Sequence, residues 1–130
     1  MRIPERPQKI SDLDLMKLLK AYSEGEATWH HDQSALGDRE RSACRELYSN
    51  ISALIEKCIH PLMDRVTARE MQGFTMHDRG HGIKVAHLMW HILMPNRRTL
   101  VTPGEIALLL ISAQLHDLWP APGFVDTCLS

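Results

Sequence analysis

Aromatic residues are scarce in this chain, at 5% of 130 residues, so its interior must be built mainly from aliphatic side chains and methionine. An excess of one charge is also missing, because 15 basic and 16 acidic residues leave a formal net charge of −1. That balance gives no reason to expect DNA, RNA or an anionic membrane surface as a partner. Hydrophobic residues nevertheless make up 44% of the chain, which is typical of a globular domain.

Long apolar runs and a secretory leader are absent as well. The longest continuous apolar run, 106–111, is far shorter than the ~20 residues needed to cross a bilayer. The N-terminal residues contain no apolar segment of the kind found in signal peptides.

The chain contains only three cysteines, Cys44, Cys58 and Cys128. We expect the first two on one helix, 14 residues and therefore ~21 Å apart. A disulfide allows at most ~7 Å between Cα atoms, so we expect reduced thiols and a cytoplasmic protein.

The length allows one domain. We expect a flexible lead over 1–10, a helical domain over 11–119 and an irregular tail over 120–130. Apolar residues at helical spacing predict a helix over 11–23, a loop over 25–37 and a helix from Asp38 onward.

The helix from Asp38 has one predicted apolar stripe, and Pro61 should break or kink it near 57–60. The stripe comprises Cys44, Leu47, Ile51, Leu54, Ile55, Cys58 and Leu62.

Two further helices complete the prediction. Val85, Leu88 and Ile92 set the inward stripe of one of them. The segment Thr102-Pro103-Gly104-Glu105 has the residues of a capping box and opens a helix that is apolar on every side, which predicts a central, buried position. No stretch alternates with period two for long enough to form a strand, so the predicted fold is all-α.

Residues of metal-ligand type close the last helix and open the one before it. His116 and Asp117 are expected on buried faces, where an imidazole and a carboxylate are costly unless paired or bound to a cation. His81 continues the stripe of Val85 at the start of its helix, and it should point toward the same core. Imidazole and carboxylate ligands together suit Mn, Fe, Zn or a related divalent ion. The alternative is a set of satisfied core histidines.

Here the sequence resembles the HD superfamily. Gly80-His81-Gly82-Ile83-Lys84-Val85 is similar to the opening "H-S-x-R-V" of these domains, and 106–118, with Leu-His-Asp-Leu at its end, is similar to their "L-L-x-A-A-x-L-H-D-I-G". Phe74-Thr75-Met76-His77-Asp78 resembles the "T-x-H-D-x-x-H" form found in HD domains attached to chaperone-like ATPases.

The resemblance implies an HD-domain-like helical bundle and a metal-dependent phosphohydrolase. It assigns His81, His116 and Asp117 as ligands of a divalent metal ion (Mn, Mg, Fe, Zn or Ni), with Asp117 also helping to orient the attacking water. It places His77 near the site as an accessory residue and Lys84 at the basic position after the first ligand. The alternatives are a loop histidine at 77 and a solvated surface charge at Lys84.

The chain departs from the HD pattern after Asp117. Trp119 stands where the family has Gly, and the final Asp ligand normally lies tens of residues further on, so Asp126 is a poor substitute. We therefore expect a fold that is incomplete at its C-terminus, as in a truncated gene product. Apolar helix faces exposed by such a truncation would favour self-association.

The remaining histidines and basic residues have weaker patterns. His87 and His91 have the i, i+4 spacing of metal ligands, but no acidic or cysteine companion lies near them in sequence. The tandem histidines at 30–31 are read as plain loop surface, and the Arg97-Arg98 pair as a solvated turn or a phosphate contact.

Two functions follow. The first is HD-type, metal-dependent hydrolysis of a phosphate ester, most readily in a nucleotide or another phosphorylated small molecule, unless truncation has inactivated it. The second is a non-catalytic helical module, for interaction or for regulation, derived from an HD domain.

Overall fold

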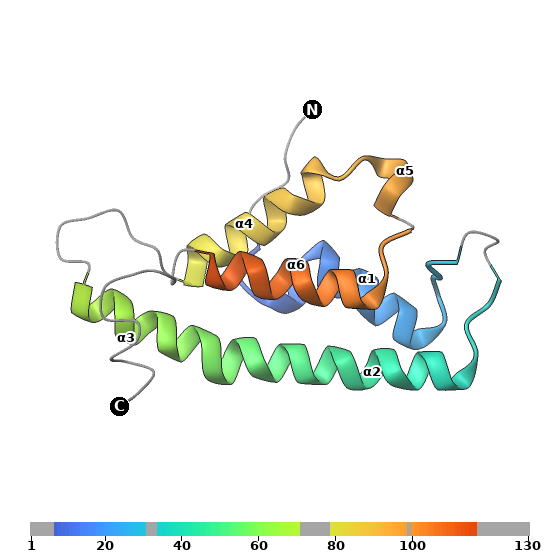
Figure 1. Ribbon diagram of the computed structural model, residues 1–130, viewed down its shortest axis with the longest axis horizontal. Helices are drawn as coiled ribbons and strands as arrows, with labels where there is room; N and C mark the ends of the chain where they lie inside the picture. The colour runs from blue at the N-terminus through green and yellow to red at the C-terminus, as the bar shows by residue number, and fades with distance from the viewer. Residues whose placement is uncertain (1–6, 31–33, 71–78, 99, 117–130) are drawn as a thin grey trace.

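The computed structural model describes residues 7–30, 34–70, 79–98 and 100–116. Within them the chain forms helices and no strand, which confirms the all-α prediction. Figure 1 shows a long rod along one side of the molecule, with the other helices packed over it. None of the described helices combines the length and the apolar character that crossing a membrane requires.

The N-terminal region forms a short 3-10 turn, η1 (Ile10–Asp12), and then helix α1 (Asp14–Glu24). Leu15, Leu19 and Tyr22 of α1 are fully buried. Gly25 ends the helix in the left-handed conformation, with φ 74°, which glycine adopts without a steric penalty. Ile10 is only 2% exposed, so the last residue of the expected flexible lead is part of the core.

The rod consists of α2 (Asp38–Ala53), a π-helical segment η2 (Leu54–Ile59) and α3 (His60–Glu70). The rod does not break before Pro61, because the π-helical turns that precede this proline accommodate its ring. A π turn contains one more residue than an α turn, as the bond from the His60 N–H to the Ile55 carbonyl shows.

The wider turns move the buried stripe of the rod, so the stripe predicted beyond Ile51 was right at Ile55 but wrong at Leu54 and Cys58. Leu54 is 40% exposed and Cys58 is exposed. The buried positions instead step by four residues and then include a histidine: Ile51, Ile55, Ile59, His60 and Met63. The described cysteines, Cys44 and Cys58, carry free thiols, as expected, and Cys128 lies outside the described residues.

Helices α4 (Arg79–Ile92), α5 (Pro95–Arg98) and α6 (Pro103–Leu115) follow. The predicted capping box is confirmed at the start of α6, where the Thr102 hydroxyl accepts a hydrogen bond from the Glu105 N–H at 3.2 Å. The Glu105 carboxylate accepts one from the Thr102 N–H at 3.3 Å. Helix α6 packs against α4 and α2, and α1 contacts α2, α4 and α6 (Figure 1).

Two predicted faces were wrong in part. Ile92 is 79% exposed, because α4 turns Ile83, Ala86 and His87 toward the core, and Val85 packs against that core only partly buried. Leu108 is 68% exposed, so α6 is not buried on every side. Both corrections have one cause: the packing partner of each helix selects which apolar residues it covers, and an apolar residue outside that contact remains exposed.

Candidate metal centre between α4 and α6

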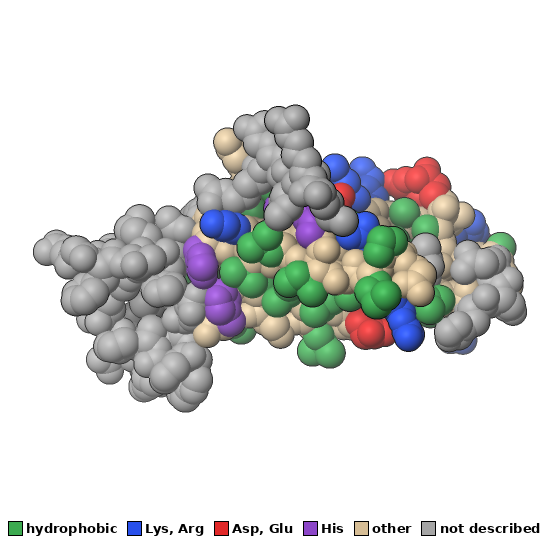
Figure 2. All heavy atoms as spheres, turned by 90° about the horizontal axis from the view of Figure 1, so that it is seen from above, with side chains coloured by type: hydrophobic (Ala, Val, Ile, Leu, Met, Phe, Trp, Pro, Cys, Tyr) green, Lys and Arg blue, Asp and Glu red, His purple; other side chains and the backbone are tan. Residues whose placement is uncertain are grey.

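Two of the predicted ligands come together at one end of the α4–α6 pair. His81 lies in the first turn of α4, and His116 is the residue that caps the C-terminus of α6. Their ring centroids are 5.3 Å apart and the rings are inclined by 35°. Figure 2 shows histidine side chains gathered at one end of the described surface. The structure therefore brings His81 and His116 of the two distant motifs close together, whereas Asp117 lies outside the described residues.

A backbone contact orients the His116 ring. Its Nδ1 lies 2.8 Å from the Ala113 carbonyl oxygen, which can only accept a hydrogen bond. The proton of a neutral ring must therefore reside on Nδ1, which leaves the lone pair on Nε2. Metal-binding histidines are commonly fixed in one tautomer by such a contact. The donor set and this orientation fit a divalent ion.

Close packing of α4 on α6 brings the two rings together. A Cβ atom added at Gly82 would lie 2.5 Å from Oε1 of Gln114, so only glycine permits this approach. The same Oε1 accepts a hydrogen bond from His60 Nε2 at 2.8 Å. Both side chains are almost fully buried, His60 at 4% and Gln114 at 1% exposure. This polar link joins α3 to α6, and it involves Gln114, which lies two residues before His116 and against Gly82, the residue after His81.

The hydrogen bond between His60 and Gln114 was not predicted from the sequence, although the sequence contains signals for it. A glycine directly after His81 and a glutamine within the apolar run of α6 both indicate close, polar helix packing. His60 could not be recognised because a regular α-helix would place it off the buried stripe.

The other predicted site residues have different outcomes. Lys84 is exposed, one turn after His81, so it carries a solvated charge at the edge of the pair. His116 is exposed, and the prediction that it emerges on a buried face was wrong, because it lies past the last helical residue of α6. His77 and Asp117 lie outside the described residues.

Two residues with weaker sequence patterns, His30 and Arg98, contact other residues through their side chains. His30 lies 3.0 Å from Oε2 of Glu40. The Gly37 N–H and His30 both stabilise the Glu40 carboxylate and lower its pKa. Arg98 donates to the Trp90 carbonyl at 3.1 Å and stacks on the Trp90 ring. Neither the histidine nor the arginine is therefore only a solvated surface residue.

A comparison with known protein families finds a match within the second half of the chain. Residues 71–126 match the HD-CE family, a span that includes α4, α5, α6 and every predicted site residue. The match confirms the resemblance to HD-type domains for this segment, and it leaves α1 and α2 outside. The searches of curated proteins and of solved structures give no match.

Proposed function

We propose that the HD-type segment forms a metal-dependent phosphohydrolase centre. His81, His116 and Asp117 would hold the ion, and a phosphate ester, most readily that of a nucleotide, would be the substrate. The approach of the His81 and His116 rings to 5.3 Å carries the proposal, because the two helices that contain the HD motifs place their imidazoles side by side.

A divalent ion bound there would lower the pKa of a coordinated water toward neutrality and polarise a phosphoryl oxygen. The protein's own groups have separate tasks. The Ala113 carbonyl holds the proton of His116 on Nδ1, so that Nε2 keeps its lone pair. Asp117 would orient the attacking water, and His77 would contact the phosphate or a second ion.

Lys84 would attract the negatively charged substrate, since its exposed ammonium group lies one turn from His81. An exposed lysine interacts weakly with a charge in water, so we assign it substrate attraction and not binding of the ion. The free thiols of Cys44 and Cys58 agree with a cytoplasmic location, which we also propose.

Metal analysis combined with hydrolysis tests the proposal. The full chain, purified without chelators, is compared with His81→Ala, His116→Ala and Asp117→Asn, with His30→Ala as a histidine control outside the HD-type segment. We expect each site variant to lose one equivalent of metal and the Mn²⁺-dependent hydrolysis of a chromogenic phosphodiester, and the control to keep both. Unchanged metal content in the site variants would overturn the assignment.

A non-catalytic interaction module is the second candidate, and exposed apolar side chains favour it. Ile92 is 79% exposed, Met94 63% and Leu108 68%, all on or beside α4 and α6. Figure 2 shows green side chains over the face that it presents. Self-association through these residues would appear as concentration-dependent sedimentation that Leu108→Lys abolishes. Metal-free protein with that behaviour and no hydrolysis would favour this candidate.

A further inference from the structure

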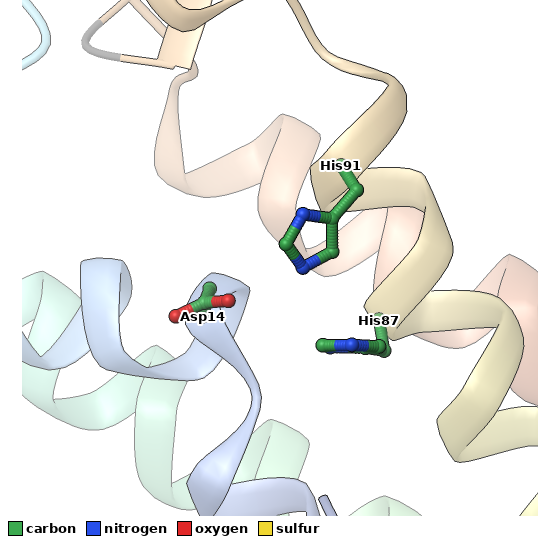
Figure 3. Close-up of side chains that lie close together, drawn as sticks. All are labelled: Asp14, His87 and His91. Carbon is green, nitrogen blue, oxygen red and sulfur yellow. The ribbon is translucent and has the colours of Figure 1, made fainter. Parts of the chain in front are cut away.

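A second group of metal-ligand side chains lies on the same helix, away from His81. Asp14 is the first residue of α1, and His87 and His91 lie one turn apart on α4. One ligand atom from each residue lies within 4.8 Å of the other two. Figure 3 shows the three side chains pointing into one shared space between the two helices.

His87 is the unusual member of this group. Its side chain is buried, at 5% exposure, yet neither of its ring nitrogens has a hydrogen-bond partner among the described residues. Nε2 of His91 is also buried without a partner in that part of the chain. The rings lie edge to face, with centroids 4.6 Å apart. A buried imidazole without a partner is unfavourable, so the arrangement calls for a group that accepts its lone pair.

We propose that Asp14, His87 and His91 bind a divalent transition-metal ion of the Zn²⁺ class. Two imidazoles and one carboxylate are a common set of three protein ligands, and they leave a further position for water. Histidines at i, i+4 project from one helix face, and a carboxylate at a helix N-terminus is favoured by the helix dipole.

The distances require the ligands to close in. In a tetrahedral site with bonds of ~2.1 Å, the ligand atoms lie ~3.4 Å apart. Separations at the present limit of 4.8 Å must therefore shorten by about 1 Å or somewhat more, which side-chain rotation can supply. Asp14 and His91 are half-buried, so their side chains have room to rotate and the ion has a path from solvent.

The site is separate from the proposed phosphohydrolase centre. His87 lies six residues after His81, which is ~9 Å along the helix. His87 and His91 converge with a residue of α1, whereas His81 lies beside His116 at the end of α6. Asp14 also lies outside the residues that match the HD-CE family. An ion here would join α1 to the HD-type segment, whether or not that segment hydrolyses phosphate esters.

Titration of the chelator-treated full chain with Zn²⁺ tests the site, with Co²⁺ absorption reporting nitrogen and oxygen ligation. All variants are made in a His81→Ala/His116→Ala background, so that failure of the proposed hydrolase centre does not affect the result. We expect this background to bind one equivalent. Asp14→Asn and His91→Ala should each weaken binding by at least ~10-fold, because each removes a direct ligand.

Glu24→Gln, at the opposite end of α1, is the matched control for loss of an acidic charge and should bind as the background does. Asp14→Asn retains shape and exposure, so a folding defect is not expected to hide its effect, and circular dichroism checks this. Zn²⁺ binding of equal affinity in Asp14→Asn and in Glu24→Gln would overturn the proposal. Absence of binding in the background would overturn it as well.

Discussion

The two ends of α4 differ in how their histidines are held. At the N-terminal end, His81 lies beside His116, whose ring is oriented by a backbone carbonyl. Farther along, His87 is buried with both nitrogens unpaired among the described residues, next to His91 and Asp14. The first end is built from two motifs that sequence reading can recognise, whereas the second depends on a residue of α1 that has no motif. A helix can therefore carry one site that its sequence indicates and another that only packing reveals.

The largest expected effect is the gain in stability when a metal ion binds at the Asp14, His87 and His91 end of α4. With Zn²⁺ at 100 times the dissociation constant of the Asp14 site, we expect the His81→Ala/His116→Ala protein to gain about 2.7 kcal/mol in its free energy of unfolding. His87→Leu in the same background should gain nothing. Without metal it should be at least as stable as its parent, because the substitution removes a buried imidazole without a partner. Urea unfolding with and without Zn²⁺ measures both quantities, and equal gains in the two proteins would contradict the comparison.

Substitution of Gly82 should damage the His81 end. Gly82→Ala places a Cβ atom 2.5 Å from Oε1 of Gln114, so it displaces Gln114 and weakens its bond to His60. We expect a loss of about 2 kcal/mol in urea unfolding. Gly104→Ala is the matched control, since nothing lies within 4 Å of its Cβ position. It should stabilise α6 by about 0.5–1 kcal/mol. Equal effects of the two alanines would show that the close approach is unimportant.

Substitution of Tyr22 tests how α1, the helix that contains Asp14, is held against the rest of the molecule. Its hydroxyl donates to the Val101 carbonyl at 2.7 Å, and Tyr22→Phe should cost about 1 kcal/mol. Burial, and then the charges of Cys44 and Glu105, raise the pKa of Tyr22 to about 12.

The raised pKa predicts the direction of a pH effect. An unfolded tyrosine has a pKa of about 10, so the contribution of Tyr22 is complete below that pH. It is lost as the pH rises from about 10 through 12, because the unfolded chain releases the proton first. Unfolding curves across this range should fall more steeply for the wild type than for Tyr22→Phe. Parallel curves would contradict the assignment.

Substitution of Arg98 should have the smallest effect on stability. It also serves as a control for the Zn²⁺ site, because it changes a residue near the His91 end of α4 that is not a proposed ligand. Its guanidinium lies 4.9 Å from the centroid of the Trp90 ring. Arg98→Ala should cost about 0.5–1 kcal/mol through the loss of this cation–π contact. It should leave Zn²⁺ affinity unchanged. A large loss of affinity would mean that the α4–α5 corner, and not the three ligands, determines binding.

The sequence predicted the helices well where the signals were local. The capping box at Thr102 and the helices beginning near residues 11 and 38 depend on neighbouring residues, and all are present. Helix faces were predicted less well, since Ile92 and Leu108 are apolar but exposed. Periodicity shows that a residue suits a core, but the partner helix decides whether it is covered.

The same distinction applies to the sites. His81 and His116 could be paired because each belongs to a motif of known separation, and the structure brings them together. The ligand roles of His81, His116 and Asp117 remain predictions. Asp14 could not be linked to His87 from the sequence, since their proximity arises only when α1 packs on α4.

The π-helical turns before Pro61 have a consequence for the whole interior. They add one residue to the winding of the rod. Every residue beyond them is therefore rotated about the helix axis by about 100° relative to its direction in a regular α-helix. That rotation aims His60 at Gln114. Regular α-helical winding of the same residues would turn the imidazole out of the interior and leave the Gln114 amide without this partner, whereas deleting one residue between 54 and 59 would allow regular winding with His60 still facing Gln114. The match between the length of this stretch and its winding therefore determines whether the helices can share their buried polar link.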